Sequence, residues 1–309
     1  MYFKKKRMIE ARFLRSDGKP NFSDRIHEVE GELRVIANRP VVTVSQRAPI
    51  REAVKLMLNN GFRRLPVVMP NRSLVGIVTS TDLVNYFGGG DFFRIVDEKH
   101  FGDIYSSMEE PLESIMTRNV IRASVDETMI DVLERMVVNN VGAIPIVDEN
   151  DRVYGIITER DILRFMADKI VGRKVHEVMT KDVIVTYPEA TIRDAAQTMV
   201  NLGFRRLPVV EDGFLHGIVV CMDIIRAFDF KNAFKFSPRG SIYDILRVPV
   251  SEIMTKRVVT IDPSADLGSV AAVMMRHNIG ALPVIEDGEL IGIITERDLV
   301  YELVLESYR

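Results

Sequence analysis

Short apolar runs alternate along this chain with amphipathic stretches, and the C-terminal part shows the order most clearly. Apolar residues at three- and four-residue spacings from Leu267 to Met275 predict a helix, which ends by Gly280. The β-branched and apolar runs that predict strands are 258–261, 282–285 and 290–294. A further helix begins at Thr295. The predicted order of this unit is therefore β-α-β-β-α.

A leucine-proline or isoleucine-proline pair inside an apolar block occurs four times, which indicates that the unit is repeated. Its prolines are Pro66, Pro145, Pro208 and Pro283. The block GFRRLPVV at 61–68 returns unchanged at 203–210, and GIITERD at 155–161 returns at 292–298. Odd repeats thus match odd repeats and even match even, as expected of a duplicated pair.

A repeat of about 60 residues buries too little apolar surface to be stable alone, so we expect the repeats to pair. The longer polar connectors, near 85–111 and 229–249, lie inside a pair rather than between pairs. The fold class is α/β with α+β character, in two tandem pairs. The predicted segments are an N-terminal extension 1–32, repeat 1 at 33–88, repeat 2 at 112–169, repeat 3 at 171–228 and repeat 4 at 248–309.

The composition fits an ordinary soluble chain and changes this picture little. It has 309 residues, 47% hydrophobic and 28% charged, with 41 Lys and Arg against 44 Asp and Glu for a net charge of −3. That balance excludes a general attraction to nucleic acid or anionic membranes. No apolar run reaches the roughly 18 residues of a membrane span, and the start lacks a secretion signal, so we expect a cytoplasmic protein.

Little in the sequence points to catalysis. The single cysteine, Cys221, cannot form an internal disulfide and is interpreted as a core residue, and the five histidines lack metal-ligand spacing. No Walker loop, dinucleotide fingerprint or nucleophile–base pair is present. We therefore expect a protein that is not an enzyme, with no catalytic residue, metal or catalytic cofactor.

Four copies of an h-P-h-h block followed by G-h-h-x-x-x-D, where h is apolar, resemble the cystathionine-β-synthase (CBS) domain family over about residues 33–305. Four such repeats in two tandem pairs, called Bateman modules, resemble the γ regulatory subunit of AMP-activated protein kinase and its single-chain archaeal relatives. The resemblance implies an energy or metabolite sensor that binds adenosine-containing ligands in clefts between paired repeats.

An aspartate follows each third strand. The four are Asp82, Asp161, Asp223 and Asp298. Thr-x-x-Asp is also the pattern of a helix capping box, which gives these residues a purely structural alternative. In repeat 3 the threonine is replaced by Val220, so the reciprocal cap cannot form, and a second role for Asp223 is favoured. Two carboxylate oxygens can accept both hydroxyls of a ribose.

The family resemblance implies that these aspartates hold the ribose and that neighbouring hydroxyls contact the nucleotide. Those hydroxyls belong to Thr79, Thr158 and Thr295. Repeat 3 lacks this threonine, and the resemblance places Thr180, just before its first strand, against the ligand there. Thr117, Thr255 and Asn38 stand at the same place in repeats 2, 4 and 1.

Arginines repeat at symmetric positions as well. The pairs Arg63-Arg64 and Arg205-Arg206 precede the second strand of the odd repeats, where alternation turns one of each pair toward core or cleft. Salt bridges at a strand mouth are the bland alternative. Guanidinium groups also match phosphate oxygens. The resemblance implies that these four, with Arg160 and Arg297 of the even repeats, form a phosphate-binding set.

Our leading hypothesis is a regulatory module that binds AMP, ADP or ATP and signals to a partner. S-adenosylmethionine is an alternative ligand, although the arginines would repel its sulfonium. Nucleic-acid binding is another alternative, through a basic N-terminal segment whose cations are Lys4, Lys5, Lys6, Arg7, Arg12 and Arg15. The sequence leaves open whether two chains form a homodimer and whether the protein partner is a kinase.

Overall fold

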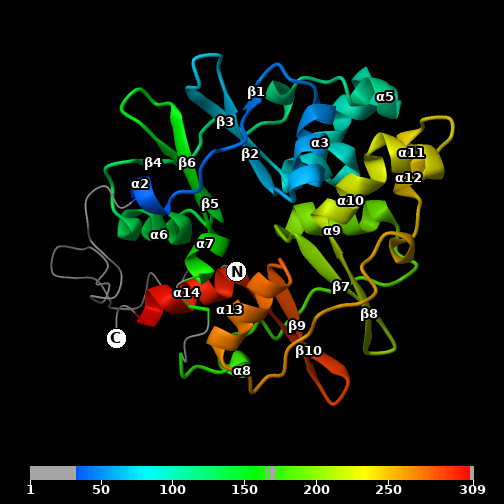
Figure 1. Ribbon diagram of the computed structural model, residues 1–309. Coiled ribbons are helices and arrows are strands. Elements are labelled where there is room, and N and C mark those ends of the chain that lie inside the picture. The colour runs from blue at the N-terminus through cyan, green and yellow to red at the C-terminus, as the bar shows by residue number, and fades with distance from the viewer. Residues whose placement is uncertain (1–32, 165, 168–170, 307–309) are drawn as a thin grey trace.

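The computed structural model describes residues 33–164, 166–167 and 171–306. The predicted N-terminal extension, its basic residues and the predicted boundary at 169–171 therefore lie wholly or partly outside the described residues. Within them, four repeats occupy the four quarters of one molecule (Figure 1). Repeat 1 is at the top, repeat 2 at the left, repeat 3 at the right and repeat 4 at the bottom of that view.

The first two repeats follow the predicted order. Repeat 1 consists of β1 (Val44–Ser45), α3 (Ile50–Asn60), β2 (Arg64–Val68), β3 (Leu74–Thr79) and α4 (Ser80–Val84). Repeat 2 consists of β4 (Ala123–Ser124), α6 (Met129–Val138), β5 (Ala143–Val147), β6 (Val153–Thr158) and α7 (Glu159–Leu163). In each, a parallel pair and an antiparallel pair form a three-stranded sheet.

The last two repeats share one four-stranded sheet, ordered β7-β8-β10-β9. Repeat 3 consists of α9 (Ile192–Leu202), β7 (Arg206–Glu211), β8 (Phe214–Val220) and α10 (Cys221–Phe228). Repeat 4 consists of α13 (Leu267–Arg276), β9 (Ala281–Glu286), β10 (Glu289–Thr295) and α14 (Glu296–Glu306). The strand predicted at 258–261 is wrong in extent, because only Ile261 forms a bridge, to Val284.

Short helices make up the segments that lead into and connect the repeats. They are α2 (Leu33–Ile36), η1 (Asn85–Gly89), η2 (Ile95–Lys99), α5 (Ile104–Ser107), η3 (Leu112–Ser114), α8 (Val175–Val178), α11 (Phe230–Phe236), α12 (Ile242–Leu246) and η4 (Val250–Glu252). The two connectors meet, since the backbone N–H of Ile104 donates to Gly240 and that of Ile242 donates to Gly102.

Repeats pair within a module by crossing over. The segment before the first strand of each repeat adds a short backbone bridge to the third strand of its sister repeat. The bridges are Asn38 to Ile156, Thr117 to Ile77, Thr180 to Ile293 and Thr255 to Ile218. The third strand carries a glycine beside each bridge, and at Gly155 an added Cβ would lie 2.6 Å from Cβ of Ala37. Glycine permits this close approach.

The two modules pack helix against helix, odd repeat on odd and even on even. One core joins repeats 1 and 3, where α4 lies against α10, and a second joins repeats 2 and 4, where α7 lies against α14 (Figure 1). Phe87 and Phe228, both fully buried, stack across the first of these with centroids 4.7 Å apart. The prediction that Cys221 is a core residue is confirmed.

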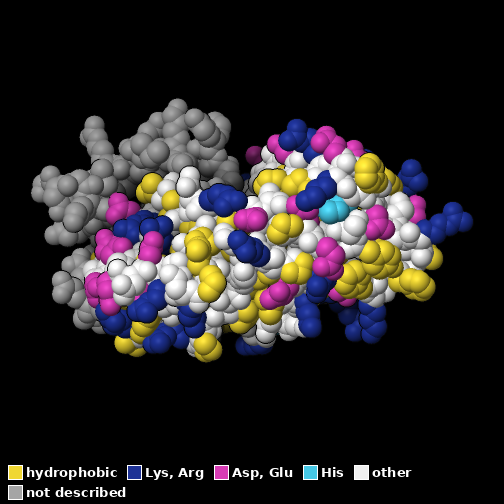
Figure 2. Space-filling model, turned by 90° about the horizontal axis from the view of Figure 1, so that it is seen from above, with side chains coloured by type: hydrophobic (Ala, Val, Ile, Leu, Met, Phe, Trp, Pro, Cys, Tyr) yellow, Lys and Arg dark blue, Asp and Glu magenta, His cyan; other side chains and the backbone are white. Residues whose placement is uncertain are grey.

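The face of the molecule drawn in Figure 2 shows no dominant charge. On the face in Figure 2, basic and acidic side chains are interspersed. Among the described residues no helix has the length and apolar character needed to cross a membrane.

Candidate functional site

The predicted aspartates lie where each third strand turns into the following helix. Each uses Oδ2 to accept the backbone N–H of the residue that caps that helix. The distances to N are 2.7 Å for Asp82, 2.8 Å for Asp161, 3.0 Å for Asp223 and 2.9 Å for Asp298. Capping is therefore one role of all four.

The structure corrects the argument made for Asp223. Val220 has no hydroxyl, but Asp223 still accepts the backbone N–H of Val220, so its half of the cap is intact. Its other oxygen, Oδ1, lies 3.0 Å from Nη1 of Arg226. Burial raises the pKa of Asp223, as it does for Asp82, because the charged carboxylate loses water there.

The crossing segments place the next set of predicted residues against the sister repeat. Thr117 bridges the strand that ends at Thr79, and Asn38 bridges the strand that ends at Thr158. The resemblance placed Thr180 with the Asp223 site, whereas its segment bridges β10, the strand that leads to Asp298. Thr255 stands beside Val220 instead. Sequence position within a repeat could not show this exchange.

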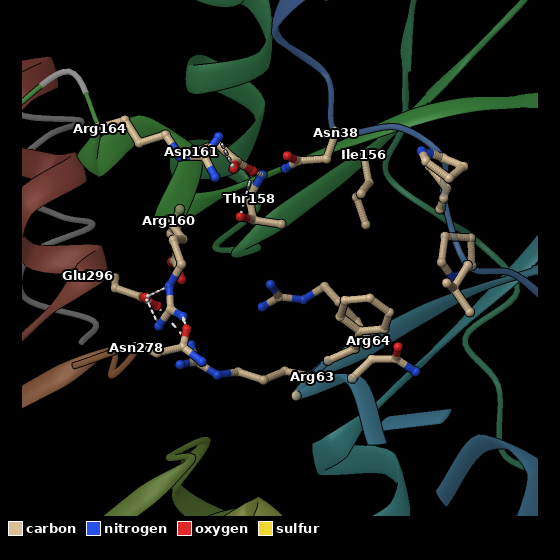
Figure 3. A pocket seen from close by; sticks show the side chains of 18 residues that line it. Asn38, Arg63, Arg64, Ile156, Thr158, Arg160, Asp161, Arg164, Asn278 and Glu296 are labelled. Carbon is tan, nitrogen blue, oxygen red and sulfur yellow. Dashed lines mark hydrogen bonds and ion pairs between the residues drawn. The ribbon is translucent and has the colours of Figure 1, made fainter. Parts of the chain in front are cut away.

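A cleft of about 360 Å³ lies between repeats 1 and 2. Asn38, Thr158 and Asp161 stand at one end, and Arg63, Arg64 and Arg160 reach toward the same space from the other (Figure 3). Thr158 donates from its hydroxyl to Oδ2 of Asp161 over 2.7 Å. Thr158 and Asp161 thus lie opposite a group of arginines. Arg164 also stands beside Asp161, with Nη1 3.8 Å from its Oδ1, and two glutamates line the cleft as well.

Two further clefts open toward the same arginines. One of about 200 Å³ includes Thr79 and Thr117 together with Arg63, Arg64 and Arg205. The other, of about 300 Å³ between repeats 3 and 4, includes Val220, Thr255 and six arginines, four of which belong to the predicted phosphate set. Those four are Arg63, Arg160, Arg205 and Arg206. Arg63 lines all three clefts, which therefore converge at the centre of the molecule.

All six predicted arginines meet at this centre, together with two glutamates that the sequence analysis did not single out. We call Arg63, Arg64, Arg160, Arg205, Arg206, Arg297, Glu159 and Glu296 the central cluster. Glu159 of the first module pairs with Arg297 at 2.8 Å and with Arg205 at 3.5 Å, both from the second module. Glu296 of the second module pairs at 2.8 Å with Arg63 and Arg160 of the first.

The electrostatics of the central cluster are those of a cation excess. Burial by itself would raise the pKa of Glu159, but Arg205, Arg297 and Arg64 outweigh it and lower that pKa to about 2. Burial and the neighbouring Arg205 lower the pKa of Arg64 to about 9. Burial and Arg63 likewise lower that of Arg206 to about 10. Partly buried guanidinium groups in this number favour an anion.

Neighbouring polar groups accept hydrogen bonds from only some of the donors of the central cluster. Arg160 donates to the amide oxygen of Asn278, Arg297 donates to that of Asn140, and Arg206 donates to the carbonyl of Gly280. One terminal nitrogen of Arg297 is buried and has no hydrogen-bond acceptor among the described residues.

The sequence contains a pattern that could have identified the two glutamates. Even repeats read Thr-Glu-Arg-Asp, and they have glycine where the odd repeats have the first arginine of each pair. A Cβ at Gly142 would lie 2.5 Å from Oε2 of Glu159, and one at Gly280 would lie 2.6 Å from Oε2 of Glu296. The glycines therefore leave room for the carboxylates.

No group of three or more histidine, cysteine, aspartate or glutamate residues could hold a metal ion in the part of the chain that the structure describes. The site is built from arginines, two glutamates, hydroxyls and the capping aspartates.

The fold and these clefts define a four-repeat binding module, and the chain belongs to the CBS domain family. The model of that domain matches residues 31–89, 112–168, 175–229 and 250–305. The chain is 38% identical over 271 residues to MJ1225, an uncharacterized protein of Methanocaldococcus jannaschii, covering 87% of this chain and 97% of that protein.

Solved structures agree. The crystal structure of MJ1225, described as a proposed archaeal homologue of the AMPK γ subunit, matches with a TM-score of 0.84 and 37% identity, over 89% of this chain and 99% of that one. An uncharacterized protein of Thermofilum pendens is 31% identical, covering 88% of this chain and 91% of that protein. A Pyrococcus horikoshii structure with 23% identity and a TM-score of 0.56, over 88% and 99% of the chains, shares the fold.

Proposed function

We propose that this chain is a non-enzymatic regulatory protein that binds adenine nucleotides, AMP, ADP or ATP, in clefts between paired repeats. One observation carries the proposal: a single cleft has Asp161 and Thr158 at one end and three arginines at the other. A ribose needs hydroxyl acceptors and a phosphate needs guanidinium donors, and a nucleotide carries both groups on one molecule.

The orientation of the ligand follows from these two ends. The ribose hydroxyls lie toward Asp161. Its Oδ2 is engaged in the cap, so the oxygen that would receive them is Oδ1, which lies 3.8 Å from Nη1 of the exposed Arg164. The phosphates point toward Arg64 and the central cluster. The base lies between Pro40 and Ile156 along the cleft wall, where apolar contacts suit an aromatic ring.

The charge of the central cluster favours nucleotides over S-adenosylmethionine. Six arginines against two glutamates leave an excess of cations at the cleft mouth, which attracts phosphate and repels a sulfonium. The family likeness to the kinase γ subunit supports a kinase or another protein as the partner that responds to occupancy.

The proposal is tested by binding measurements on the full chain with Asp161→Ala. Loss of the ribose contact should weaken AMP, ADP and ATP binding by on the order of tenfold or more. Because Asp161 also caps α7, the change removes a cap as well, which by itself costs about 1 kcal/mol of stability.

A matched control is available in Asp131→Ala. Asp131 accepts the N–H and hydroxyl of Thr128 at 2.9 and 2.7 Å, the same box as at Asp161, but it lines none of the three clefts. It should destabilise the chain similarly and leave binding unchanged. Equal nucleotide affinity in both variants would contradict the ribose assignment, and a native chain that binds S-adenosylmethionine but no nucleotide would contradict the ligand class.

A further inference from the structure

The two buried glutamates of the central cluster hold most of the cations that a phosphate would need. Their side chains are 6% and 4% exposed, and each pairs with two arginines of the opposite module. Four of the six arginines are thus already bound to a carboxylate. Arg64 and Arg206 have no ion-pair partner among the described residues.

Both kinds of arginine line the same cleft. Arg64 reaches into the 360 Å³ cleft without a carboxylate partner, while Arg63 and Arg160 line it from their ion pairs with Glu296 (Figure 3). Glu159 and Glu296 line it as well. A first phosphate can therefore contact Arg64 directly, whereas a phosphate that reaches Arg63 or Arg160 must displace a carboxylate.

A glutamate occupies this position in both even repeats and in neither odd repeat. In the odd repeats the residue equivalent to Glu159 and Glu296 is Ser80 or Cys221, both buried and neither charged at neutral pH. A glycine at 142 or 280 leaves the space that each carboxylate occupies. The carboxylates are therefore built into the centre, not incidental surface partners of the arginines.

We propose that Glu159 and Glu296 are specificity-determining residues, resident anions that set how strongly each added phosphate of a nucleotide contributes to binding. The inference rests on the proposed function. A carboxylate repels the incoming phosphate and accepts the hydrogen bonds that the arginines would otherwise donate to it. Each phosphate beyond the first therefore adds less binding free energy than it would beside unpaired arginines. The two glutamates thereby narrow the difference in affinity between AMP and ATP.

The test is Glu296→Gln in the full chain, with adenosine, AMP, ADP and ATP titrated in turn. Glutamine keeps the shape and one acceptor oxygen. It removes the charge and replaces the other oxygen, which faces Arg63 or Arg160, by an NH2 group. Adenosine affinity should stay within about twofold, and nucleotide affinity should rise with phosphate number, reaching on the order of tenfold for ATP. Glu149→Gln, which removes one charge from an exposed turn, should change none of these values.

Two results would overturn the inference. Equal changes for adenosine and ATP would show that Glu296 does not act on phosphate, and weaker nucleotide binding would make it a group that positions arginines for the ligand. If Glu296→Gln does not fold, Glu296→Asp withdraws the carboxylate by one methylene at constant charge. It should also raise the ratio of ATP to adenosine affinity, and an unchanged ratio would contradict the inference.

Binding measurements on the native chain distinguish a failure of this inference from a failure of the proposed function. If it binds neither adenosine nor nucleotides, the proposed function is wrong and the inference falls with it. If it binds them, and the variant shows the native phosphate preference, only the assignment of Glu159 and Glu296 is wrong.

Discussion

Glu159 shows how a buried carboxylate can remain charged at the centre of this protein. Taking it out of water opposes ionisation, but three arginines outweigh that cost, and its pKa falls from the ordinary 4.5 to about 2. The same contacts join the modules, because Arg205 and Arg297 belong to the second and Glu159 to the first. Binding chemistry and module packing therefore depend on the same side chains.

This depressed pKa predicts an acid-sensitive contribution to stability. Because the folded-state pKa of Glu159 lies below its unfolded value, its ion pairs stabilise the fold fully above about pH 4.5, and that contribution is lost as the pH falls toward 2. The free energy of unfolding in urea should fall across this range more steeply for the native chain than for Glu159→Gln. Parallel pH profiles for the two proteins would contradict the assignment.

The arginines show what sequence could and could not predict at this scale. The family resemblance implied that Arg63, Arg64, Arg160, Arg205, Arg206 and Arg297 form one set, and the structure brings them to one centre. Their anions were missed because Glu159 and Arg205 lie in different modules, and pairing between modules depends on how the modules dock. Whether phosphate also binds there stays a prediction.

At the scale of elements, the crossing segments decide which residues share a cleft. Periodicity gave the helix and the second and third strands of repeat 4 with small errors at their ends, because each has its own apolar pattern. It overstated the first strand, where only one residue pairs with β9. The placement of Thr180 near Asp298 was also missed, because the exchange between sister repeats leaves no periodic signal.

The contact between Ala37 and Gly155 tests this crossing. A methyl group at Gly155 would lie 2.6 Å from Cβ of Ala37, which is attached to backbone that cannot move away freely. Gly155→Ala should therefore destabilise the chain by about 1–3 kcal/mol. Adding Ala37→Gly should recover part of that loss, giving a coupling of at least about 0.5 kcal/mol in a denaturant cycle. Strictly additive effects would mean that the two positions do not touch.

At the scale of the molecule, the two large cores each join the two modules, and among the described residues only a small apolar cluster of Val68, Leu74, Val147 and Val153 lies within the first module. One core draws on repeats 1 and 3 and the other on repeats 2 and 4, so each module contributes half of both. The sequence predicted tandem pairs, but it showed neither the shared centre of charge nor that the apolar surfaces of the helices would join the modules. An apolar face in the sequence predicts which residues are buried, but it does not predict which element packs against them.

Shared cores predict that the whole chain unfolds as one cooperative unit. Phe228→Ala removes half of the buried stack with Phe87, which joins the modules, and should cost about 3–5 kcal/mol. Calorimetry should show one transition in the native chain and one, at lower temperature, in the variant. Phe234 is 63% exposed, so Phe234→Ala should leave the transition temperature unchanged. Two separate transitions in the native chain would mean that the modules fold independently. The same would follow if only part of the heat absorption shifted to lower temperature in the variant. The ion pairs between the modules would then have to account for their docking.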